Sequence, residues 1–111
     1  MPLSVIFRVD ASLQIGTGHV MRCLTLADAL GDQGAECQFV CREHEGHLMD
    51  HIRSQSYQVH ALPKPSANIS CGVDLAHSSW LGVNCSTDAQ QTRQIARGAK
   101  FDWLIVDHYA L

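Results

Sequence analysis

Short apolar runs alternate with stretches of helical periodicity along the 111 residues of this chain. The runs that predict strands are 4–10, 36–42, 57–62 and 101–109, and the stretches that predict helices are 19–30, 44–54 and 87–98. Such alternation builds βαβ units, in which parallel strands carry helices on both faces. We therefore predict an α/β fold with a Rossmann-like parallel sheet of strand order 3-2-1-4, joined by right-handed crossovers. The first and last runs are the most continuously apolar, which favours central positions for both strands.

Smaller signals refine this arrangement. Thr87 and Gln90 form a capping-box pattern, which predicts that the last helix begins at Thr87. Four further residues are predicted to pack in the interior, namely Cys37, Cys41, Trp80 and Trp103.

Composition and charge exclude several classes of protein. The formal net charge is −3 and the eight Lys and Arg residues are scattered singly, so no basic stripe suits a nucleic acid. The five cysteines include no C-x-x-C pair, which argues against a disulfide framework or a zinc ribbon and favours reduced thiols. The N-terminus does not read as a signal peptide, and no apolar run approaches the roughly 20 residues of a membrane span. We therefore expect a cytoplasmic protein with no nucleic-acid or membrane partner.

Polar clusters follow the first and the last strand. Asp10 and Ser12 lead into the sequence GTGH, and Asp107, His108 and Tyr109 end the last run. In an open α/β sheet, ligands bind beyond the carboxyl ends of the strands, where the strand order reverses. The order 3-2-1-4 puts that point between these two strands, so we expect both clusters to line one crevice. Polar residues also commonly end a buried strand, and position alone leaves that plainer role open.

The GTGH loop places a histidine at the start of the first helix. Gly16 and Gly18 can adopt a positive φ and leave room for a ligand near the backbone. The free N–H groups and the dipole of the helix favour an anion and oppose an imidazolium, and a neutral imidazole can act as a general base. Asp10 could orient His19, while Arg22 could bind the ligand, form an ion pair or face solvent. The loop matches neither the G-x-G-x-x-G fingerprint nor the P-loop, so a glycine-rich turn with a surface histidine is the alternative.

Two other groups of side chains have structural interpretations. Arg8 and Asp10 could pair with each other near the end of the first strand. His44, His47 and His51 have spacings that could place them on one helix face. No carboxylate or cysteine completes a ligand set there, so a solvated polar face is favoured and no metal is expected.

Four segments resemble one family of nucleotide-sugar enzymes. RVDASLQIGTGHVMRCLTLADAL resembles the opening of the UDP-sugar hydrolases of pseudaminic acid synthesis, the PseG family, which are themselves similar to the spore-coat polysaccharide protein SpsG. AECQFVCREHEGHL, then WLGVN before a Thr-Asp helix start, then DWLIVDHYAL match later segments of the family in the same order.

The resemblance implies a two-domain, GT-B-like fold with the active site between the domains. It implies hydrolysis of UDP-2,4-diacetamido-2,4,6-trideoxy-β-L-altropyranose to UDP and the free sugar, with inversion at the anomeric carbon and with no metal or other cofactor. Residues 1–111 are then the N-terminal Rossmann-like domain, and a second domain, which supplies most of the UDP site, is expected outside this chain. His19 is implied as the base that activates water, and Tyr109 as a sugar contact. The residues expected to bind the substrate are Asp10, Ser12, Gly16, Thr17, Gly18, Arg22, Asp107, His108 and Tyr109.

Two other functions stay open at the level of sequence. One is a GT-B-type UDP-sugar glycosyltransferase, in which His19 would deprotonate an acceptor hydroxyl. The other is a non-catalytic module that binds a nucleotide-sugar or a protein. Because one domain offers few donors for two phosphates, we expect residues 1–111 alone to be inactive. The face that would meet the second domain is expected to expose apolar surface, which favours self-association.

Overall fold

The computed structural model describes residues 3–12, 15–44, 46–64, 83 and 85–108 of the chain. The elements in chain order are β1 (Ser4–Val9), α1 (Gly18–Asp32), β2 (Glu36–Arg42), α2 (Met49–Ser54), β3 (Gln58–Leu62), α3 (Cys85–Ala99) and β4 (Trp103–Asp107). The four strands form one sheet of order β3-β2-β1-β4, in which every neighbouring pair is parallel. The predicted α/β class and strand order are confirmed.

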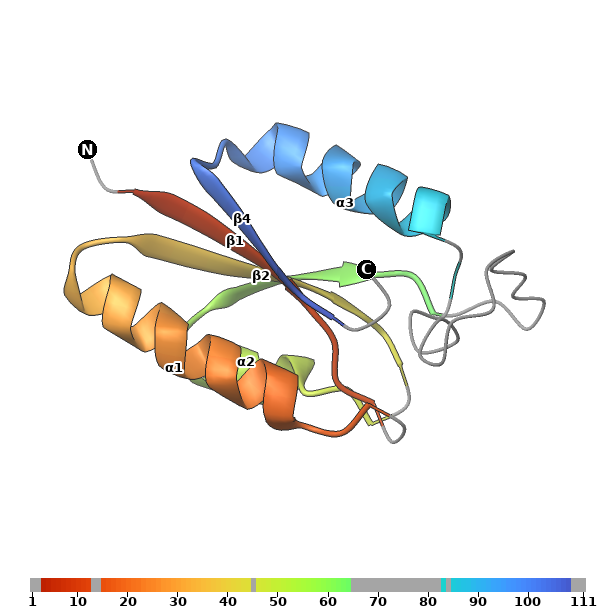
Figure 1. The fold of residues 1–111 in the computed structure, drawn as a ribbon, viewed down its shortest axis with the longest axis horizontal. Helices are drawn as coiled ribbons and strands as arrows, with labels where there is room; N and C mark the ends of the chain where they lie inside the picture. The colour runs from red at the N-terminus through yellow and green to blue at the C-terminus, as the bar shows by residue number, and fades with distance from the viewer. Residues whose placement is uncertain (1–2, 13–14, 45, 65–82, 84, 109–111) are drawn as a thin grey trace.

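Helices cover both faces of the sheet, with α1 and α2 on one side and α3 on the other (Figure 1). Successive side chains of a strand point to opposite faces, and β1 uses this alternation to separate two environments. Val5, Phe7 and Val9 pack in the larger core beneath α1 and α2. Ile6 packs in the smaller core beneath α3, and Arg8, also buried, contacts that helix. β1 therefore presents an entirely apolar face to α1 and α2, whereas its face toward α3 carries the charged side chain of Arg8.

All three described helices begin at a residue other than the expected one, and α1 begins at Gly18, one residue before His19. The second begins at Met49 rather than at His44, because the chain turns directly after β2, where the amide of His44 bonds the carbonyl of Arg42 at 2.8 Å. The expectation that His44 shares a solvated helix face is wrong, since its side chain is buried. α3 begins two residues before Thr87. None of the helices in the described segments combines the length and the apolar character that a membrane span requires.

The position of β4 corrects a second expectation. β4 pairs with β1 and is the outer strand of the described sheet, so the last strand is not central. Trp103 is 62% exposed and is not a packing anchor, while Trp80 lies outside the described residues. Cys41 is buried in the larger core and Cys37 packs against it, as predicted.

Candidate functional site

His19 lies in the first turn of α1, beside the carboxyl end of β4. Its Nδ1 is 2.8 Å from Oδ1 of Asp107, the last residue of β4. An ionised carboxylate can only accept a hydrogen bond, so the contact with Asp107 favours the tautomer with the proton on Nδ1 and the lone pair on Nε2, whereas a terminal nitrogen of Arg22, 3.1 Å from the same Nδ1, favours the opposite tautomer. The side chain of His19 is 9% exposed. The pair has the geometry of a general base that is oriented by a carboxylate.

Arg22 holds the same carboxylate from one turn further along α1. Its Nε donates to Oδ2 of Asp107 at 2.5 Å, and a terminal nitrogen donates to Oδ1. The hydrogen bonds from Arg22, and then that from His19, lower the pKa of Asp107 well below its usual range, although partial burial opposes them. Asp107 is therefore an anion. The two-point contact also fixes the direction in which its carboxylate faces His19.

The loop before α1 leaves space beside this pair. Ser12 ties the loop together, since its Oγ accepts from the amide of Ile15 at 2.9 Å and its carbonyl accepts from that of Gly16 at 2.8 Å. Gly16 has a φ of +82°, which favours glycine. Gly18 has no such φ, and a Cβ at Gly18 would meet no atom within 4 Å. Thr17 and Gly18 are both exposed, so the loop offers an open surface at the helix start.

Asp10 lies at the centre of a separate, fully buried cluster. Its Oδ1 accepts from Arg8 at 2.6 Å and from the amide of Arg42 at 2.7 Å, and its Oδ2 lies 3.2 Å from Nε2 of His44 and 3.1 Å from Nε2 of His108. Burial alone would raise the pKa of Asp10, but the bonds from His108 and His44 and the charge of Arg8 outweigh it and lower the pKa well below its usual range. The expectation that Asp10 orients His19 is therefore wrong, because Asp107 does so.

Two buried arginines connect this cluster to α3. Arg8 donates to both oxygens of Asp88, at 3.0 and 2.5 Å, and Arg42 donates to Oδ2 of Asp88 at 2.9 Å. The predicted pairing of Arg8 with Asp10 is confirmed. Buried charges persist only when they are paired, so two arginines and two aspartates here balance each other and fasten α3 to the sheet.

The structure brings the two predicted polar clusters together at the carboxyl ends of β1 and β4. His19, Arg22 and Asp107 form one group, and Asp10 and His108 form another. Tyr109 lies outside the described residues. Sequence reasoning missed three residues of the buried network, namely His44, Arg42 and Asp88. An arginine in an otherwise apolar strand was the available signal, because a buried guanidinium needs carboxylates, but nothing in the sequence named the distant partner.

Near His19 and Asp107, we also considered the Cys23 thiol as a nucleophile and the nearby side chains as ligands of a metal ion. Cys23 lies 3.6 Å from Oδ2 of Asp107, and burial together with that charge raises the pKa of the Cys23 thiol to about 12. The thiol is therefore a poor nucleophile at neutral pH. In the segments that the structure describes, no three His, Cys, Asp or Glu side chains are grouped so that they could hold a metal ion.

Comparison with known proteins finds one curated protein that is similar along almost the whole of this chain. No protein-family model matches the chain. A UDP-2,4-diacetamido-2,4,6-trideoxy-beta-L-altropyranose hydrolase from Campylobacter jejuni is 30% identical to it over 109 residues. The match covers 98% of this chain and 29% of that hydrolase, so the chain spans less than a third of the length of this relative. The chain is thus a distant relative of part of this hydrolase.

Proposed function

We propose that this chain is the N-terminal, sugar-side domain of a nucleotide-sugar hydrolase in which His19 is the general base. The observation that carries the proposal is the 2.8 Å contact between Nδ1 of His19 and Asp107, at the carboxyl ends of the strands where an open α/β sheet binds its ligand. The similarity to a UDP-sugar hydrolase adds independent support.

The reaction follows from the tautomer of His19. Nε2 removes a proton from a water molecule, and the water oxygen forms a bond to the anomeric carbon of the sugar. The bond from that carbon to the β-phosphate oxygen breaks on the opposite face, and UDP leaves with the electron pair. The configuration at the anomeric carbon is therefore inverted. Asp107 stabilises the imidazolium that forms, and Arg22 keeps Asp107 ionised and aligned.

The proposed substrate is UDP-2,4-diacetamido-2,4,6-trideoxy-β-L-altropyranose, an intermediate of pseudaminic acid biosynthesis. The amide groups at the start of α1 and the Thr17–Gly18 backbone would face the sugar or the near phosphate, because both residues are exposed beside His19. A second domain would hold most of UDP. His19 and Gly18 thus belong to one wall of an interdomain cleft, and closure of the cleft would exclude bulk water.

The test is His19→Ala in the two-domain form of this protein that the proposal implies. We expect turnover to fall by about two to four decades, as loss of a general base usually causes, with little change in the thermal unfolding midpoint. His51→Ala is the matched control, because His51 is exposed on α2, away from the site, and should leave turnover unchanged. Product analysis by NMR should show the free sugar and UDP.

Two outcomes would contradict the proposal. Near-normal turnover of His19→Ala would remove His19 from the mechanism. Transfer of the sugar to an acceptor hydroxyl, with no free sugar formed, would make the protein a glycosyltransferase with the same base.

A further inference from the structure

We propose that His108 is a positioning residue, whose buried contact with Asp10 holds the carboxylate of Asp107 against the base. Nε2 of His108 lies 3.1 Å from Oδ2 of Asp10, and Oδ1 of Asp107 lies 2.8 Å from Nδ1 of His19. Both contacts are features of the structure itself. Only their effect on turnover rests on the function proposed above.

The two contacts lie on opposite faces of the sheet and involve consecutive residues. The last described pair between β1 and β4 is Val9 with Asp107, so Asp10 and His108 are the next residues on the two chains. Successive side chains of an extended chain point to opposite faces. Asp107 therefore faces α1, where it contacts His19, and His108 faces α3, where it contacts Asp10. A displacement of His108 would thus move Asp107 as well, because one peptide bond joins them.

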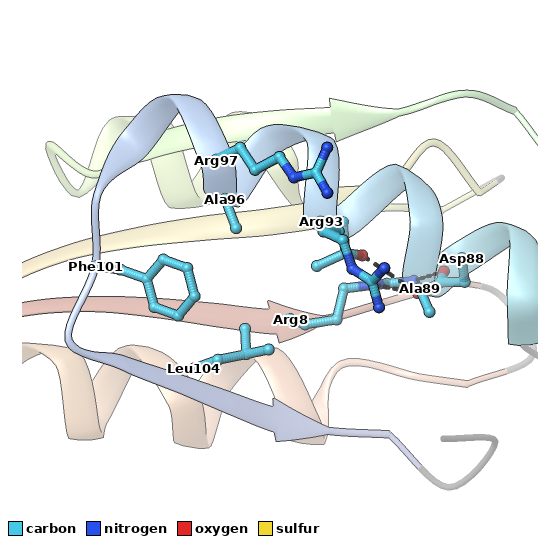
Figure 2. A pocket seen from close by; sticks show the side chains of 9 residues that line it. Arg8, Asp88, Ala89, Arg93, Ala96, Arg97, Phe101 and Leu104 are labelled. Carbon is cyan, nitrogen blue, oxygen red and sulfur yellow. Dashed lines mark hydrogen bonds and ion pairs between the residues drawn. The ribbon is translucent and has the colours of Figure 1, made fainter.

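Asp10 is a fixed point of attachment for His108. Its side chain is buried, and its carboxylate accepts hydrogen bonds from Arg8 at 2.6 and 3.0 Å and from the amide of Arg42 at 2.7 Å. Figure 2 shows Arg8 extending from β1 toward Asp88, which lies in the first turn of α3 and accepts from Arg8 with both oxygens. The sheet and α3 together therefore fix the carboxylate that His108 contacts.

The position of Asp107 matters because Arg22 competes for the same nitrogen of His19. A terminal nitrogen of Arg22 lies 3.1 Å from Nδ1 of His19, compared with 2.8 Å for Oδ1 of Asp107. A guanidinium can only donate, so Arg22 favours the tautomer with the lone pair on Nδ1 and the proton on Nε2. That tautomer cannot remove a proton from water through Nε2. The position of Asp107 therefore decides which tautomer of His19 predominates.

His44 provides a matched comparison within the same cluster. Its Nε2 lies 3.2 Å from the same Oδ2 of Asp10, and both histidines are buried. His44 follows β2, which pairs with β1 on the side away from β4. Loss of either imidazole removes a similar contact to Asp10, but only His108 is next to Asp107 along the chain.

The test is the tautomer of His19 in the 111-residue chain. The nitrogen chemical shifts of the ring report it by NMR, at a pH well above the usual pKa of a histidine. In the wild type we expect the proton on Nδ1. His108→Leu should lower the ratio of the Nδ1–H to the Nε2–H tautomer by about fivefold or more, a change of the size that one hydrogen bond supports.

Two variants separate the position of Asp107 from general stability. His44→Leu should leave the tautomer ratio of His19 unchanged. His108→Gln should restore the ratio, because its amide N–H can still reach Oδ2 of Asp10. Circular dichroism checks that each variant folds, and His108→Asn, whose amide is too short to reach Asp10, replaces His108→Leu if the leucine variant does not fold.

Several results would overturn the inference. One is a tautomer ratio in His108→Leu that equals that of the wild type, and another is a wild-type His19 with its proton on Nε2. An equal change in His44→Leu, or no recovery in His108→Gln, would show that the contact with Asp10 does not act through Asp107. If His19→Ala keeps near-normal turnover while His108→Leu shifts the tautomer, the proposed function is wrong and the positioning by His108 stands.

Discussion

Replacing Asp10 by asparagine should destabilise the fold by about 3–5 kcal/mol at neutral pH, the usual cost of removing one partner from a buried ion pair. Asp10 is 0% exposed, and its carboxylate contacts Arg8, the amide of Arg42, His44 and His108. Asparagine keeps the shape of the side chain but removes the charge. It also turns an oxygen that accepts hydrogen bonds into a donor, which then faces other donors.

The magnitude follows from the charge balance beneath α3. Arg8 and Arg42 carry two positive charges, and Asp10 and Asp88 carry two negative ones. The substitution leaves one guanidinium charge buried without a counter-charge. A domain of this size has a free energy of unfolding of about 5–15 kcal/mol, so the loss is a large part of the total. Urea unfolding at neutral pH, followed by circular dichroism, measures it.

The pH dependence provides an independent check with a definite sign. The pKa values of Asp10 and Asp88 are lowered in the folded state, whereas an aspartate in the unfolded chain has a pKa of about 3.9. At pH values below that, the unfolded state binds more protons, so stability falls as the pH falls toward the folded-state values. Above about pH 5 the contribution is complete. The wild type should therefore lose more stability than Asp10→Asn between pH 5 and pH 3.

Asp50→Asn is the matched control. The Asp50 side chain is 93% exposed, its contact with Arg53 is 3.4 Å long, and its replacement should cost less than about 0.5 kcal/mol. A cost below about 1 kcal/mol for Asp10→Asn would refute the argument. An equal loss of stability in acid for wild type and variant would refute it as well.

Four further outcomes are expected. In the two-domain hydrolase proposed above, Asp107→Asn should lower turnover by about a hundredfold or more, because an amide does not hold His19 in the tautomer with the proton on Nδ1; unchanged steady-state kinetics would contradict this. Gly16→Ala should cost about 1–2 kcal/mol in urea unfolding because φ is +82°, and an equally stable variant would contradict that loop geometry. The Cys23 and Cys41 thiols, whose pKa values burial raises to about 12, should react with iodoacetamide at pH 8 far more slowly in the folded than in the unfolded chain, and equal rates would count against their burial. Residues 1–111 alone should bind UDP with a Kd on the order of millimolar or weaker and release no UDP from the sugar nucleotide, and micromolar binding by calorimetry would contradict this.

The sequence predicted the order of the strands because hydrophobic periodicity and the rules for parallel connections act locally and leave few topologies. It also predicted that the ends of β1 and β4 meet, which the contact between His19 and Asp107 confirms. It did not predict which carboxylate meets which base. Asp10 is near His19 along the chain. However, Asp10 points to the α3 side of the sheet, as Ile6 does, and there its carboxylate contacts Arg8 and His108.

The exposure of β4 was also hidden from the sequence. An apolar run reads the same in a central strand and in an outer one, because periodicity reports how apolar a segment is and not what covers it. Trp103 illustrates the limit, since it is 62% exposed within a strand that is otherwise typical of an interior. Likewise, Asp88 in the first turn of a helix is ordinary, and only its contact with Arg8 makes it structural.

The long separations within the site have a consequence for how the protein folds. His19 and Asp107 are 88 residues apart, and Asp10 and His108 are 98 residues apart. Closing loops of this length lowers the conformational entropy of the chain before the new contacts contribute any stabilising free energy. Proteins rich in such contacts therefore fold slowly. During synthesis, the strands up to β3 leave the ribosome before β4 exists. The contact between His19 and Asp107 therefore cannot form until the chain has been synthesised through β4.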